Sequence, residues 1–95
     1  MSTSITVGEK FELGRLVATP AALAVVPNEE ILRALRRHQV GDWGDVCPED
    51  HAANERALVD GSRLFSVYHA LSGPKFWIIT EWDRSVTTIL LPEDY

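Results

Sequence analysis

The feature that most constrains the fold of this chain is a series of short β-type segments between Leu64 and Leu91. From Leu64 to His69, successive side chains suit opposite faces of a strand, which is the period-two pattern of a β-strand. The next segment reads FWIIT and is apolar on both faces, as expected of an inner strand. Residues 86–91 are again β-branched and apolar. Because the connecting loops are short, we expect a three-stranded antiparallel β-meander.

A strand and a short helix are expected near the N-terminus. The segment RLVA at residues 15–18 is short and partly β-branched, which predicts a strand. Thr19 can cap the helix that follows, and Pro20 fits its first turn. We therefore expect a strand followed by a helix from Pro20 to Val25.

Two further helices are expected before the meander. Asn28 and the two glutamates after it are typical of a helix start, which predicts a second helix over residues 29–39. Its apolar residues Ile31, Leu32 and Leu35 share one face. A third helix over residues 49–59 should end at Gly61. The predicted fold class is α+β, with an N-terminal strand and three short helices followed by the meander.

The length of 95 residues leaves room for one domain, which we place at residues 11–95. Residues 1–10 are polar and aperiodic, so we expect a flexible tail or a short edge strand at residues 5–7. The apolar middle strand needs cover on both faces. Helices can cover one face, and the N-terminal segment, a second copy of the chain or a partner would cover the other.

The charge and the cysteine content narrow the classes of function. A net charge of −5 disfavours broad attraction to nucleic acid and suits contact with basic protein surfaces. A single cysteine, Cys47, cannot form an internal disulfide, which favours a reducing cytoplasm. The N-terminus does not resemble a secretion signal, and the longest apolar run is too short for a bilayer, so we expect no membrane partner.

Metal binding is the first chemistry to test, because His38, Cys47, His51 and several carboxylates lie close in sequence. Their spacing does not match a paired-ligand zinc pattern. A pairing of Cys47 with His51 as nucleophile and base likewise lacks the flanking motif of a cysteine hydrolase. We expect no metal and no cofactor.

Whether the chain is an enzyme stays open at this point, although a non-enzymatic role is favoured. Helices followed by an antiparallel sheet are also the order of barnase-like toxin ribonucleases, an analogy of fold alone. A metal-independent ribonuclease needs a base, an acid and a cation, which His38, His69 and Arg84 could supply. Nucleic acid is expected as a partner only in this alternative.

Protein binding is the main hypothesis from the residues. Trp43 lies on a glycine-flanked loop, where a large aromatic is either packed over the sheet or used as an anchor for a partner. Asp42 and Asp45 flank it, and Arg36 and Arg37 form part of a basic stripe on the second helix. These five residues are the candidate partner-binding set, and a homodimer is a further candidate assembly.

Several stretches together resemble a known group of small proteins: FELGRLVATPAAL, RHQVGDWG, GSRLFSVYHA and DRSVTTILLPEDY. The chain is similar to proteins carried by plasmids and integrative elements of proteobacteria, often labelled as plasmid-related or as a restriction-modification subunit. A methyltransferase subunit needs a glycine-containing cofactor loop on a parallel sheet, and this chain has no such loop. The resemblance instead implies mobile-element cargo, which at this size often consists of toxins, antitoxins, regulators or inhibitors of host defence, and it carries over no catalytic residue. Among these we expect a host-defence inhibitor of anti-CRISPR or anti-restriction type.

Overall fold

The computed structural model describes residues 8–95. Residues 1–7, which include the expected edge strand and most of the expected tail, lie outside this part. Lys10 already makes an ordered contact, because its backbone N–H donates to the Gln39 carbonyl at 2.7 Å. Within residues 8–95, no helix combines the length and the apolar character needed to cross a lipid bilayer.

The three helices lie close to their predicted positions. They are α1 (Pro20–Val25), α2 (Asn28–Gln39) and α3 (Pro48–Asp60). Thr19 caps α1 as predicted, since its hydroxyl accepts from the Ala22 N–H at 3.1 Å. α2 begins one residue earlier than predicted, after Pro27, without a side-chain cap. α3 ends at Gly61, whose φ of 79° is the left-handed conformation that glycine adopts without strain.

The sheet confirms the α+β class and corrects the predicted topology. The strands β2 (Leu64–His69), β3 (Lys75–Thr80) and β4 (Val86–Leu90) pair antiparallel in chain order. The N-terminal strand β1 (Arg15–Ala18) joins them, pairing parallel with β4. The result is a four-stranded mixed sheet in the order β1-β4-β3-β2, not a three-stranded meander with a separate strand.

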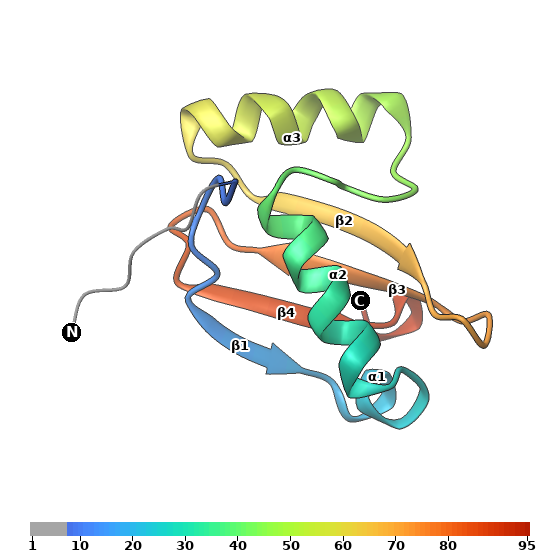
Figure 1. The fold of residues 1–95 in the computed structure, drawn as a ribbon. Helices are drawn as coiled ribbons and strands as arrows, with labels where there is room; N and C mark the ends of the chain where they lie inside the picture. The colour runs from blue at the N-terminus through green and yellow to red at the C-terminus, as the bar shows by residue number, and fades with distance from the viewer. Residues whose placement is uncertain (1–7) are drawn as a thin grey trace.

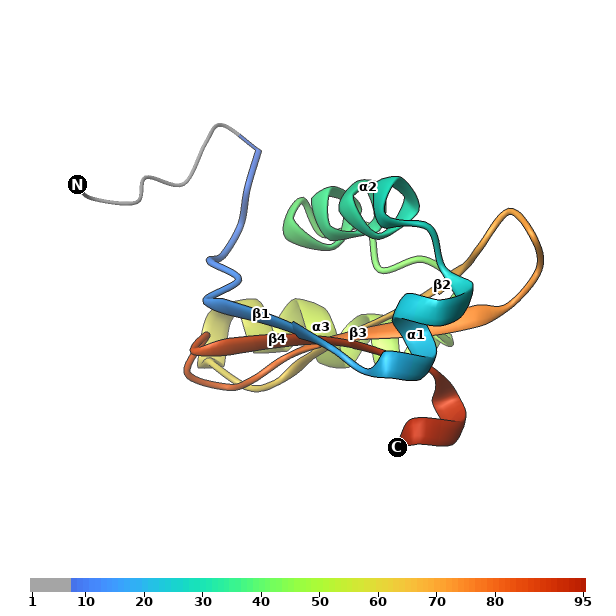
Figure 2. The same cartoon turned by 90° about the horizontal axis from the view of Figure 1, so that it is seen from below.

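The helices are arranged around this sheet unequally. Helix α2 crosses one face, whereas α3 lies along β2 at the edge of the sheet (Figure 1). A short 3-10 helix, η1 (Pro92–Asp94), lies on the face opposite α2 (Figure 2). On that face the Trp77 ring meets the ring of the C-terminal Tyr95, with centroids 5.7 Å apart. Part of the second cover is therefore the segment that ends in Tyr95, and not one of the three expected covers, which were the N-terminal segment, a second copy of the chain or a partner.

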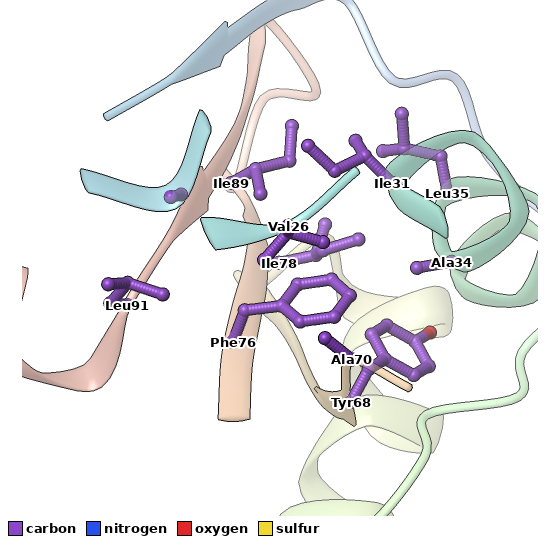
Figure 3. Packing of buried hydrophobic residues seen from close by; sticks show 11 residues of the cluster. Val26, Ile31, Ala34, Leu35, Tyr68, Ala70, Phe76, Ile78, Ile89 and Leu91 are labelled. Carbon is purple, nitrogen blue, oxygen red and sulfur yellow. The ribbon is translucent and has the colours of Figure 1, made fainter. Parts of the chain in front are cut away.

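The main core lies between α2 and the sheet (Figure 3). Ile31, Ala34 and Leu35 of α2 pack toward side chains of β2, β3 and β4, among them Phe76 and Ile78. The predicted buried face of α2 is wrong at Leu32, whose side chain is 53% exposed. Ala34 and His38 take the inward positions instead, because the buried stripe follows the i, i+3, i+4, i+7 spacing from Ile31, and Leu32 lies to one side of it.

The two edges of the sheet differ in their hydrogen bonding. The outer edge of β2 is occupied: the Asn54 side chain bonds both backbone groups of Phe65, at 2.7 and 3.0 Å. Val67 exchanges backbone bonds with Trp43 and Asp45, at 3.0 and 2.8 Å. These contacts leave β1 as the uncovered edge, since no segment of the described chain crosses in front of it (Figure 2).

Candidate partner-binding surface

His38, the first residue of the ribonuclease alternative, is completely buried. Its Nδ1 lies 2.6 Å from Ser66 Oγ, and its Nε2 lies 2.9 Å from Thr80 Oγ1. Thr80 Oγ1 in turn lies 2.7 Å from Thr87 Oγ1, and the Thr87 hydroxyl donates to the Leu13 carbonyl at 2.7 Å. Buried polar side chains must be satisfied in this way, so the arrangement is a structural network under α2.

Each hydrogen bond in this network can run in only one donor-to-acceptor direction, and this determines the tautomer of His38. The Leu13 carbonyl can only accept, so Thr87 donates to it and must accept the proton of Thr80. Thr80 then accepts from the Nε2–H of His38. His38 Nδ1 is therefore unprotonated and accepts from Ser66. Burial, and to a smaller extent the charge of Arg84, lowers the pKa of His38 from 6.5 to about 3.

The other two residues of that alternative do not form a site with His38. Arg84 donates to three backbone carbonyls, including that of Ala57 in the last turn of α3 at 2.9 Å. His69 follows Ser66 by three positions, so the two side chains leave β2 on opposite faces. The His69 ring instead lies 2.8 Å from Asp45. The three side chains therefore do not meet at one exposed site, and His38 has no access to solvent.

Trp43 is also placed differently from the anchor hypothesis. Its side chain is only 2% exposed and packs with Phe11, Ala57 and Leu64. The indole N–H donates to Glu55 Oε2 at 2.8 Å, so its polar atom is satisfied. The expected exposed anchor is wrong, and the alternative of packing beside the sheet is the one that the structure shows.

The remaining predicted partner-binding residues do lie at the surface. Arg37 makes a two-pronged contact with Asp42, with Nε to Oδ2 at 2.7 Å and Nη2 to Oδ1 at 3.2 Å. The Arg37 guanidinium also lies over the Tyr68 ring, 4.8 Å from its centroid. The hydrogen bond with Arg37 lowers the pKa of Asp42, and the same bond raises the pKa of Arg37. Arg37 is therefore a fixed cation that is still 46% exposed.

A cleft of about 210 Å³ lies beside Arg37, between α2 and the β2–β3 end of the sheet. Its walls include Arg33, His69 and Leu71. Leu71 follows β2, and its side chain is 86% exposed. The Glu30 carboxylate accepts the Leu71 N–H at 2.9 Å, which ties this exposed residue to α2. Sequence reasoning missed Leu71, because a lone leucine in a loop carries no periodic signal.

We call this region the α2 surface and define it by its exposed members. They are Arg33, Arg36, Arg37, Asp42, Asp45, His69 and Leu71. It combines cations on the helix, anions on the loop after it and one apolar side chain. Such a mixture is typical of a protein-contact surface.

The candidate metal ligands are not gathered by the fold. Cys47 is exposed just before α3, and its carbonyl accepts from the His51 N–H at 2.9 Å, which is a helical backbone bond. Among residues 8–95, no three His, Cys, Asp or Glu side chains come together in a way that could hold a metal ion.

The chain was also compared with known proteins. No family model, no curated protein and no solved structure matches it.

Proposed function

We propose that this chain is a non-enzymatic protein-binding module that meets its partner through the α2 surface. The observation that carries the proposal is Leu71, a large apolar side chain that is 86% exposed yet held in place through its backbone by Glu30. Single exposed apolar side chains are common on protein surfaces, but this leucine lies at a cleft that exposed arginines also line, so a partner that covers it removes apolar area from water where charge contacts are also on offer. Because the backbone of Leu71 is already held by Glu30, less conformational entropy is lost when a partner binds.

The charges around Leu71 indicate what the partner would present. Arg33 and Arg36 are exposed on α2, and Arg37 is held rigidly by Asp42 and Tyr68. Arginines positioned in advance are frequent hot spots of protein interfaces, because they bind carboxylates with two bonds. The partner surface should therefore offer an apolar pocket for Leu71 with carboxylates beside it.

The specific form of the proposal is an inhibitor of a host defence system, encoded on a mobile genetic element. It is supported by the resemblance to plasmid-borne proteins and by the net charge of −5. Asp42 and Asp45 are the anions of the α2 surface and could meet a basic site that the target uses for nucleic acid. Inhibition would then follow from occlusion of that site, without any reaction.

A co-purification experiment tests the protein-binding proposal. The tagged chain, Leu71→Glu and Arg36→Glu should be compared with Val59→Glu and Arg56→Glu, which make the same changes at exposed positions of α3. We expect the wild type and both α3 variants to retain a common partner that the two α2-surface variants lose. Equal retention by all five proteins, or no partner at all, would contradict the proposal.

A phage plating assay tests the proposal that the chain inhibits a host defence system. Expression of the chain in cells that carry a CRISPR or restriction system should raise the plating efficiency of a targeted phage. Val59→Glu should retain this effect, and Leu71→Glu should lose it. If the wild-type chain leaves plating unchanged against a panel of such systems, the defence-inhibitor form is excluded while the protein-binding form can still hold.

A further inference from the structure

The uncovered edge of β1 carries two free sets of backbone groups. Arg15 N–H donates to Ser85 O at 2.9 Å, and Thr19 N–H donates to Ile89 O at 3.0 Å. Because bonding direction alternates along a strand, residues 15, 17 and 19 face β4, and Leu16 and Ala18 point their N–H and C=O groups outward. An edge of this kind can pair with another strand.

Apolar side chains border the same edge on the α2 side. Leu16, Leu23 and Leu32 are 49%, 54% and 53% exposed. All three line a groove of about 300 Å³ between β1, α1 and α2. A strand paired with β1 would lie beside this groove and remove part of its apolar surface from water.

The opposite side of the edge has a pair of charges that selects the occupant. Arg15 lies near the start of β1, and its side chain is exposed without a partner among the described contacts. At the other end of β1, the Thr19 hydroxyl donates to Asp94 Oδ2 at 2.7 Å. The Leu91 N–H donates to the same oxygen at 3.0 Å, so the carboxylate is fixed in position. Residues 15 and 19 share a face of the strand, the face that carries η1 (Figure 2).

We propose that the occupant is a second copy of this chain, with the two β1 strands antiparallel about a two-fold axis at Val17. This register pairs Leu16 of each copy with Ala18 of the other, so that all the free backbone groups are used. It also places Arg15 opposite Thr19 of the second copy. The Asp94 carboxylate of that copy is bound to Thr19, so it lies where Arg15 can pair with it. The two-fold axis makes this contact twice, and the two sheets become one.

The charge arrangement distinguishes this occupant from a foreign strand. A foreign strand could use the backbone groups of Leu16 and Ala18, but nothing requires it to carry an anion and a cation at the matching positions. The chain itself supplies both, Arg15 at one end of β1 and Asp94 at the other. The dimer is independent of the α2 surface and of the proposed partner.

Sedimentation or light scattering tests the inference on the full chain. The wild type should show a concentration-dependent mass that rises toward twice 10.6 kDa. Ala18→Pro removes the outward N–H without removing a bond to β4, and should leave the chain monomeric. Arg15→Glu should weaken dimerisation at least about tenfold, because like charges then face each other twice. Arg56→Glu, the same reversal on α3, should change nothing.

A charge exchange gives the most specific readout. Asp94→Arg alone should weaken dimerisation at least about tenfold, for the same reason as Arg15→Glu. Mixed together, these two variants should form a heterodimer, since each contact then joins one cation and one anion. Ala18→Pro and Arg15→Glu retain Asp94 and test the inference even if Asp94→Arg does not fold. A monomeric wild type, a dimer that all these variants retain, or the failure of two folded charge variants to associate would overturn the proposal.

Discussion

Acid should destabilise this protein through His38, at pH values where carboxylates are still ionised. The His38 pKa is 6.5 when the side chain is in water and about 3 in the folded protein. Between these values the unfolded chain binds a proton that the folded chain does not bind, so the free energy of unfolding falls as the pH falls. From pH 7 to pH 5 the loss is about 2 kcal/mol, since each unit of pKa difference corresponds to about 1.36 kcal/mol.

The loss is large for a domain of this size. Small domains have free energies of unfolding of about 5–15 kcal/mol, and 2 kcal/mol corresponds to a decrease of about 8–16 °C in melting temperature. The carboxyl groups of Asp42, Asp60 and Asp83 have lowered pKa values, and their contribution is lost only as the pH falls below the usual range of an aspartate. Between pH 7 and pH 5 the effect of His38 on the free energy of unfolding is therefore separated from that of these carboxyl groups.

Urea unfolding followed by tryptophan fluorescence at several pH values measures this effect. His38→Gln should be less stable than the wild type at pH 7, because the network with Ser66 and Thr80 is disturbed, but its stability should depend only weakly on pH. His51→Gln, a change at an exposed histidine, should retain the steep dependence. In NMR spectra, the His38 ring should remain the Nε2–H tautomer down to about pH 5. Equal pH dependence in the wild type and His38→Gln would refute the reasoning.

Three substitutions test other contacts by thermal or urea unfolding. Trp43→Phe keeps an aromatic ring in the core but loses the bond to Glu55 and leaves a cavity where the larger indole packs, and should cost about 2 kcal/mol. Gly44→Ala should cost more than about 2 kcal/mol, because its φ of 74° is left-handed and the new methyl group would overlap the Val67 carbonyl; Gly73→Ala, also at positive φ but in open space, is the control. Arg84→Met removes the bonds to three carbonyls and should cost about 2 kcal/mol; an unchanged stability would show that these bonds contribute little.

Local patterns in the sequence predict most of the secondary structure. Capping by Thr19, the stop at Gly61 and the period-two segment after Leu64 are signals within a few residues. The three α-helices and the four strands lie within about two residues of their predicted places, whereas η1 was not predicted. The parallel pairing of β1 with β4 was not predicted, because nothing in RLVA indicates a partner strand about 70 residues away. Non-local pairing depends on the packing of the whole chain.

Local patterns in the sequence also do not determine the burial of Trp43 and His38. Gly41 and Gly44 have φ values of 84° and 74°, which let the loop turn inward and deliver Trp43 to the core. The glycines suggested flexibility in the sequence, whereas in the fold they allow tight packing. A usable signal for His38 did exist: Ser66 and Thr80 are polar residues at inward positions of otherwise apolar strands, which indicates a buried polar partner.

The occupied edge of β2 limits how far this sheet can grow. Asn54 acts as a stopper there, since its side-chain amide takes the place that another strand's peptide group would need. The β2 edge of the sheet is occupied, and only the β1 edge can pair with another strand. When two copies pair through their β1 edges, both outer edges of the joined sheet are β2 edges, which are occupied. Self-association by this route stops at two chains and cannot lengthen into a fibre.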